Sequence, residues 1–183
     1  INRKKIMIMK NQILFLLTVL FIAFSSCQKS KNLDKQSGSE YSNEIKKIIE
    51  EKNAEIEAWY SVGLIDSVVT HFADQSIQLP PNQPPLIGIE NFKEAWNQNL
   101  QIGKWEFDLN TQQVKADGNL ASEFGTYTLS FSPNENSPIP AIKDKGSYVV
   151  LWEKINDDWK VVWDAPVSEM PIPNMMTDSI SGE

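Results

Sequence analysis

The stretch "SYVVLWEKINDDWKVVWDAPVS" (residues 147–168) holds two runs rich in valine and tryptophan, separated by the polar residues 156–158. Residues with high strand propensity on either side of a short polar turn predict a β-hairpin. Simple alternation along the two strands places Tyr148, Trp152 and Trp163 on one face. We interpret such an aromatic sheet face as core packing or a dimer interface, with ligand stacking as the alternative.

The sequence before this hairpin has the same period of two, which marks half-buried strands. In residues 104–114, large apolar side chains alternate with polar ones, and a turn at residues 117–119 leads into a second strand over 120–132. Residues 133–146 form a long irregular connection to the hairpin. The C-terminal half of the chain is therefore predicted to be a run of antiparallel strands.

Three amphipathic segments come earlier and predict helices. They are a long helix from Ser42 or Asn43 to Gly63, a short helix over 65–72, and a third over 88–103. Between the last two, residues 76–79 predict a strand that stops at Pro80, because proline donates no backbone hydrogen bond. Helices followed by antiparallel strands predict an α+β domain in which a curled sheet wraps the three helices.

The first residues predict export. Basic residues precede an apolar run at 13–24, which is too short to span a bilayer comfortably, so residues 1–26 are predicted to be a signal peptide. Cys27, the only cysteine, follows two small residues in an arrangement that resembles the lipobox of bacterial lipoproteins. The resemblance implies lipid attachment at Cys27 and anchoring to a bacterial membrane. Gln28 in the next position suggests the periplasmic side of the outer membrane, if the host is Gram-negative.

Composition divides the rest of the chain into three parts. Residues 27–41 are polar and too poor in large apolar side chains to form a core, so they are predicted to be a flexible tether. Residues 42–170 have the composition and length of one globular domain. Residues 171–183 are predicted to be a disordered tail.

Charge and residue content exclude several classes of function. The net charge of −7 without a basic stripe excludes nucleic acid as an expected partner. His71 is the only histidine, and no set of His, Asp and Glu residues has metal-ligand spacing, so neither a metal nor a cofactor is predicted. We expect His71 to occupy a solvated helix position and not a catalytic one.

Three longer segments of the globular part resemble a known superfamily. They are "GLIDSVVTHFADQSIQLPPNQPPLIGIENFKEAW", "EFGTYTLSF" and "KGSYVVLWEKINDDWKVVWDAPVS". They resemble SnoaL-like and ketosteroid-isomerase-like proteins of the nuclear transport factor 2 superfamily, in particular uncharacterised secreted bacterial members. The resemblance implies a cone whose concave face, closed by three helices, encloses a pocket. It also implies a homodimer through the convex face of the sheet.

The resemblance also implies which residues line the pocket. On the last strand it places Asp164 toward the pocket, and Val161 and Trp163 on the opposite face. The full set of predicted ligand-binding residues is Ile56, Tyr60, Phe72, Gln78, Phe92, Trp96, Phe124, Leu151 and Asp164. Asp164 is the only carboxylate among them and the one candidate for catalysis, because an apolar surrounding disfavours its charged form. The alternative is a structural aspartate bonded to a backbone amide or to Tyr60.

The predicted function is binding of a small, largely apolar molecule without ketosteroid isomerase activity. Counting along the resemblance, the isomerase's base falls on Pro80 and its two oxyanion donors on Ile56 and Leu151, none of which can perform those roles. One alternative is a SnoaL-like isomerase, cyclase or hydratase that uses Asp164 as general base, with Tyr60 or Gln78 polarising the substrate. Another alternative is a dimeric protein-interaction module.

Overall fold

The hairpin at residues 147–168 forms the C-terminal part of β5 (Ile142–Ile155) and all of β6 (Asp158–Ser168) in the computed structural model of the chain. Asn156 and Asp157 both have positive φ, at 51° and 65°, the backbone of a tight turn that follows the twist of the flanking strands. The structure describes residues 36–170. The predicted signal peptide, Cys27 and the predicted tail at 171–183 lie outside the described residues.

The sheet has six strands in the order β2-β1-β6-β5-β4-β3. The other strands are β1 (Phe72–Gln78), β2 (Leu86–Ile87), β3 (Gly103–Asp117) and β4 (Leu120–Pro133). Most neighbours are antiparallel, as predicted, but β1 pairs with β6 in parallel, so the sheet is mixed. In the chain, β2, α4, β3, β4 and β5 lie between these two strands. The predicted α+β fold is confirmed.

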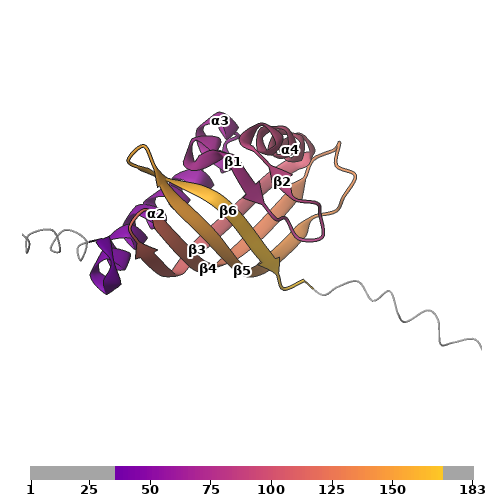
Figure 1. Cartoon of the computed structure of the whole chain (residues 1–183). Coiled ribbons are helices and arrows are strands. Elements are labelled where there is room, and N and C mark those ends of the chain that lie inside the picture. Colours follow the sequence, from indigo (N-terminus) through magenta and orange to yellow (C-terminus); the bar gives the residue numbers. More distant parts are fainter. Residues whose placement is uncertain (1–35, 171–183) are drawn as a thin grey trace, which may run out of the picture.

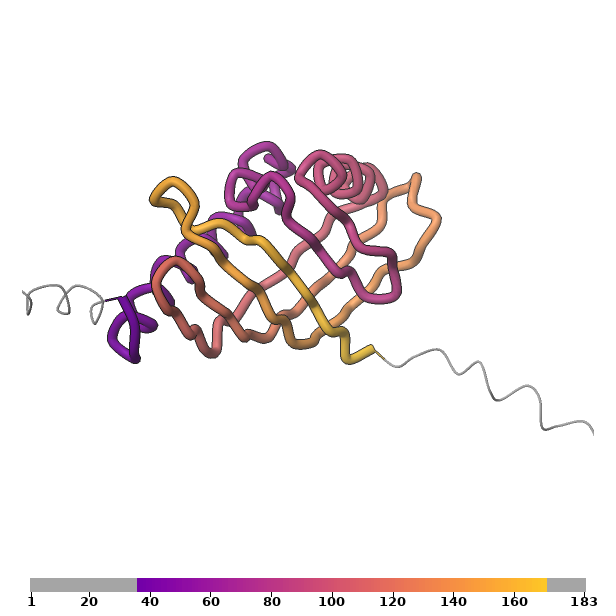
Figure 2. Tube along the Cα trace, viewed as in Figure 1, coloured from indigo at the N-terminus to yellow at the C-terminus, as the bar shows by residue number. Residues whose placement is uncertain are grey.

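The helices gather against one face of this sheet (Figure 1). They are α2 (Gly38–Ser61), α3 (Ile65–Val68), a 3-10 turn at Val69–His71, and α4 (Ile89–Ile102). We call the sheet face that α2 and α4 cover the inner face, and the opposite one the outer face. The two ends of the described chain lie at opposite ends of the sheet (Figure 2).

Helix α2 begins at Gly38, four residues earlier than the predicted Ser42. The extra turn is attached to the sheet, because the Tyr41 hydroxyl donates to the carbonyl of Gly118 over 2.8 Å. Residues 38–41, predicted to belong to the tether, are therefore helical. At the other end Gly63 has φ of 78°, and its N–H donates to the carbonyl of Tyr60, which ends the helix as predicted.

Aromatic side chains fill much of the space between the helices and the inner face. Phe72, Phe92 and Trp96 contact one another with ring centroids 5.3 to 5.6 Å apart, and Tyr60 lies edge-on between Trp96 and Phe107. Such offset and edge-on pairs add to the free energy gained from apolar burial. This cluster fixes α4 against β1 and positions the residues described below.

The faces predicted for the hairpin are partly wrong. Tyr148 and Trp152 are buried on the inner face, at 3% and 0% exposure, and Val161 is buried with them. Trp163 lies on the outer face with 57% exposure, as predicted. The reason is a β-bulge: Trp152 pairs with Val161, whereas the preceding Leu151 pairs with Trp163. One extra residue in β6 reverses the alternation relative to β5.

Candidate functional site

The candidate site is built around Asp164, on the inner face of β6. Gln78, at the end of β1, pairs with it in register and donates from Nε2 to Asp164 Oδ2 over 2.7 Å. Trp96 of α4 donates from Nε1 to Gln78 Oε1 over 3.2 Å. We call Tyr60, Gln78, Trp96, Phe107 and Asp164 the Asp164 site.

The tryptophan fixes the direction of these hydrogen bonds. An indole N–H can only donate, so the Gln78 side chain must turn its oxygen toward Trp96 and its NH2 group toward Asp164. Asp164 Oδ2 is therefore an acceptor. A proton on this carboxyl group belongs on Oδ1, for which no partner exists among the described hydrogen bonds.

The surroundings of Asp164 favour its neutral form. Burial raises the pKa of the carboxyl to about 6, and the negative charge of Glu123 also raises it, while the hydrogen bond from Gln78 acts in the opposite direction. Asp164 nevertheless keeps part of its surface accessible to solvent. A carboxyl group that lies deep in the domain but keeps some accessible surface can exchange a proton near neutral pH.

Aromatic rings provide the apolar part of the site. The ring of Tyr60 is 5.9 Å from that of Trp96 and 5.2 Å from that of Phe107. Burial raises the pKa of Tyr60 to about 12, so its hydroxyl stays protonated and can donate a hydrogen bond. The site thus combines apolar rings with one acidic group.

The structure brings together some of the predicted ligand-binding residues and separates others. Tyr60, Gln78, Trp96 and Asp164 meet at one site, while Ile56, Phe72 and Phe92 are buried in the core around it. Phe124 is 45% exposed and Leu151 pairs with the exposed Trp163, so both lie on the outer face. The prediction that Phe124 and Leu151 face the pocket is wrong, because Phe124 pairs with the exposed Val149 and Leu151 with the exposed Trp163.

Glu123 is a buried carboxylate that the sequence analysis missed. The residue is 1% exposed and receives four hydrogen bonds of 2.7 to 2.9 Å. The donors to Oε1 are Asn53, Thr111 and Tyr148, and the donor to Oε2 is Trp152. The sequence does contain a signal for this burial. Ala121, Glu123 and Gly125 alternate onto the same face of the strand, and the small side chains at 121 and 125 leave room beside Glu123 for the large side chains that bind it.

His71 is buried, at 6% exposure, and not solvated as predicted. Its ring stacks on Trp59 with centroids 5.1 Å apart. Nε2 lies 2.7 Å from Glu55 and Nδ1 lies 3.3 Å from the ammonium of Lys52. Because Lys52 donates to Nδ1, the Nε2–H tautomer fits this position. Burial and the neighbouring Lys52 lower the pKa of His71. These contacts join α2 to the 3-10 turn and give His71 a structural role.

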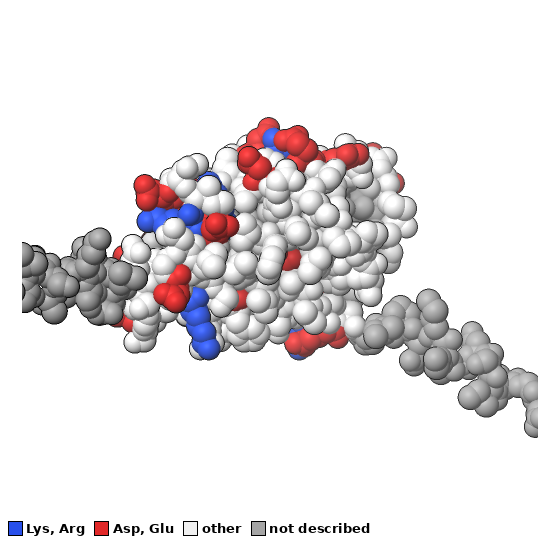
Figure 3. Space-filling view, in the orientation of Figure 1, with Lys and Arg blue, Asp and Glu red and all other residues white. Residues whose placement is uncertain are grey.

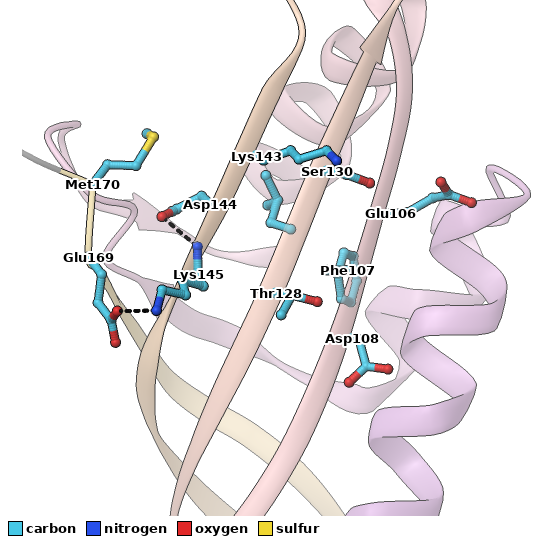
Figure 4. Close-up of a pocket in the computed structure, with 11 residues that line it drawn as sticks. Glu106, Phe107, Asp108, Thr128, Ser130, Lys143, Asp144, Lys145, Glu169 and Met170 are labelled. Carbon is cyan, nitrogen blue, oxygen red and sulfur yellow. Dashed lines mark hydrogen bonds and ion pairs between the residues drawn. The ribbon is translucent and has the colours of Figure 1, made fainter.

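A separate hollow of about 660 Å³ lies over strands β3, β4 and β5 (Figure 4). Its exposed lining residues Asp108, Thr128 and Lys145 pair in register on the outer face. Both charge signs are present, and Lys145 is 3.2 Å from Glu169. Phe107 is the one residue that this hollow shares with the Asp164 site, and Gln78, Trp96 and Asp164 do not line it.

Neither a metal site nor a membrane span is found in the described part of the chain. Within residues 36–170, no group of three or more His, Cys, Asp or Glu side chains could hold a metal ion. No helix in the same range is long and apolar enough to cross a membrane.

Comparison with solved structures identifies the fold, while no family model and no curated protein matches the sequence. A nuclear transport factor 2-like superfamily protein from Salmonella enterica superposes with a TM-score of 0.61 at 15% identity, over 77% of this chain and 99% of that one. A ketosteroid isomerase-like protein from Erwinia carotovora gives 0.58 at 12% identity, over 67% and 95%. A nuclear transport factor 2-like protein of unknown function from Pseudomonas putida gives 0.56 at 16% identity, over 75% and 92%. The chain has the fold of these proteins, as the sequence resemblance predicted.

Proposed function

We propose that the protein binds a small, largely apolar molecule at the Asp164 site, and that Asp164 recognises a hydrogen-bond donor on it, such as a hydroxyl group. The observation that carries the proposal is the fixed chain from Trp96 through Gln78 to Asp164. It leaves one carboxylate oxygen, Oδ1, available to a ligand, and the ring of Trp96 at the other end of this chain lies 5.9 Å from that of Tyr60. Apolar walls with a few oriented polar groups are typical of small-molecule sites.

Catalysis by the same carboxyl group is the second candidate. A general base works best when its pKa is near the working pH, and the pKa of Asp164 is raised to about 6. In a SnoaL-like isomerase, cyclase or hydratase, Oδ1 would take a proton from the substrate, and the neutral hydroxyl of Tyr60 would polarise it. The oxygen and the NH2 group of the Gln78 amide both have hydrogen-bond partners already. Tyr60 is therefore favoured over Gln78 as the group that polarises the substrate.

Ketosteroid isomerase activity is not part of the proposal. Ile56 is a buried core residue and Leu151 lies on the outer face, so neither can serve as an oxyanion donor. The inner-face neighbours of Leu151 are Val150 and Trp152, and neither is an acid. Pro80 follows the end of β1 and has no proton-accepting side chain.

Binding can be tested with naphthol and naphthalene as matched probes, followed by tryptophan fluorescence at neutral pH. We expect naphthol to bind several-fold more tightly than naphthalene to the wild type, because its hydroxyl donates to ionised Asp164. The Asp164→Ala variant should remove this preference. Leu64→Ala, at a 51% exposed position outside the Asp164 site, is the control variant. Equal binding of both probes to wild type and Asp164→Ala would contradict the proposal.

We also propose that the protein forms a homodimer through the outer face of the sheet. Phe124, Val149, Trp163 and Val167 are 45% to 63% exposed there, although they are large and apolar. The side of the molecule on which β6 lies nearest the viewer is largely uncharged, with charged side chains mainly near its edges (Figure 3). Contiguous apolar surface of this kind favours association. Export and lipid attachment at Cys27 complete the proposal and rest on the sequence alone.

A further inference from the structure

The buried carboxylate of Glu123 has no part in the proposed binding of a ligand. The free energy needed to bury its charge therefore requires an explanation. An isolated ionised carboxylate in a protein interior is strongly unfavourable. Here four donors surround it, and two of them, the amide of Asn53 and the indole of Trp152, are N–H groups. The hydroxyls of Thr111 and Tyr148 complete the set. This arrangement stabilises a negative charge at a fixed position.

The sheet register places this charge close to Asp164. Glu123 of β4 pairs with Val150 of β5, and Val150 pairs with Asp164 of β6. The three residues form one row on the inner face, and two strand spacings, about 10 Å, separate the backbones that carry the two carboxyl groups. Between them lies Val150, an apolar and buried residue that provides no screening.

We propose that Glu123 is a positioning residue for the Asp164 site, a fixed negative charge that controls whether Asp164 carries a proton. The inference rests on the proposed function, because it takes Asp164 as the acid–base group of the site. Loss of the proton from Asp164 places a second negative charge in the same row. Glu123 therefore favours the protonated form, whereas the hydrogen bond from Gln78 favours the ionised one.

The other elements around the site bring no competing charge. Gln78 of β1, Trp96 of α4 and Tyr60 of α2 are neutral side chains. Burial and the neighbouring Glu123 raise the pKa of Tyr148, so this residue is neutral as well. Among the described residues, Glu123 is thus the charged group that acts on Asp164.

Coulomb's law gives the size of the effect. Two unit charges about 10 Å apart, at an effective dielectric constant of about 20, change a proton affinity roughly tenfold, or about one pH unit. A tenfold change near neutral pH decides whether Oδ1 accepts a hydrogen bond from a hydroxyl group or donates one to a carbonyl group. Glu123 would therefore influence which class of ligand the site prefers.

The test is a titration of side-chain carboxyl groups by carbon-detected NMR, on the purified protein without any ligand. In Glu123→Gln, an isosteric change that removes the charge, we expect the midpoint of Asp164 to fall by about one pH unit. Tyr148→Phe removes one donor but keeps the charge, so it should leave the midpoint close to the wild-type value. An unchanged midpoint in a folded Glu123→Gln variant would overturn the proposal.

A second measurement needs no variant, in case Glu123→Gln does not fold. In the wild type, the titration midpoint of Asp164 should lie well above the ordinary value of an aspartate, because burial and Glu123 both raise its pKa. A wild-type midpoint at or below the ordinary value would refute the inference. Neither titration uses naphthol, so failure of the proposed ligand binding and failure of this inference can be told apart.

Discussion

The substitution Gly125→Ala tests whether the aromatic packing of the inner face is as tight as the structure indicates. A Cβ at Gly125 would overlap the ring and hydroxyl of Tyr148, which crosses this glycine to reach Glu123. The methyl group must therefore displace Tyr148. In an unobstructed strand the same change would stabilise the protein by roughly 0.5–1 kcal/mol, since glycine is unfavourable there. The two effects have opposite signs, which makes the outcome decisive.

The loss of stability caused by Gly125→Ala can be estimated from the contacts of Tyr148. Overpacking of a buried site costs about 1–3 kcal/mol, and loss of a hydrogen bond to a charged group costs about 1.5–3 kcal/mol. After the gain from replacing glycine, we expect Gly125→Ala to lower the free energy of unfolding by roughly 2–5 kcal/mol. For a domain of this size, that corresponds to a fall in Tm of about 6 °C or more.

Thermal unfolding followed by circular dichroism measures this change. In the double variant Gly125→Ala with Tyr148→Ala, the new methyl group no longer meets a ring, so adding Gly125→Ala to Tyr148→Ala should cost little. A Tm for the single variant Gly125→Ala equal to or above that of the wild type would refute the packing described here.

Three further predictions concern other parts of the chain. His71 has a lowered folded pKa, so the unfolded chain binds its proton first, and stability should fall as pH drops below about 6.5. Asp164 has a raised pKa, so its protonation has the opposite effect on stability at lower pH. The contribution of His71 is therefore measured as the difference in unfolding free energy between wild type and His71→Phe. This difference should depend on pH. Trp163→Glu on the outer face should give monomers in sedimentation, whereas Leu64→Glu should not; a monomeric wild type would contradict the dimer. Cys27→Ser should release the protein from the membrane fraction, and unchanged retention would argue against lipid attachment.

Periodicity in the sequence was sufficient to predict the type of the long helix and the long strands. The three- and four-residue steps of α2 and the alternation in β3 are long and regular, so their type could be predicted directly. The parallel pairing of β1 with β6 could not, because it joins segments about ninety positions apart and depends on how the whole sheet curls. The start of α2 was also missed, since its first turn is held by a contact between Tyr41 and Gly118 and not by a strong local cap.

The errors at the candidate site come from one residue. Without the bulge in β6, Tyr148, Trp152 and Trp163 would share a face, which is what alternation predicts. The bulge inserts one residue and turns Tyr148 and Trp152 inward. No local pattern marks it, because the valines on both sides suit either face. The resemblance placed Asp164 on the inner face, where the structure has it, but it also placed Val161 on the opposite face, and counting back from the hairpin placed Leu151 toward the pocket.

The inward turn of these two aromatic residues places their rings and polar groups on the inner face. Tyr148 crosses Gly125 and Tyr127 crosses Gly146, so rings from adjacent strands cover the glycine positions of the inner face. Tyr148 and Trp152 use their polar groups to stabilise Glu123. The acidic group left partly accessible in this row is Asp164 at the β6 end. Tyr148 and Trp152 thus both pack the core and stabilise the charge of Glu123 beside the candidate site. A substitution of either should lower stability, whereas the protonation of Asp164 should change only when the charge of Glu123 is lost.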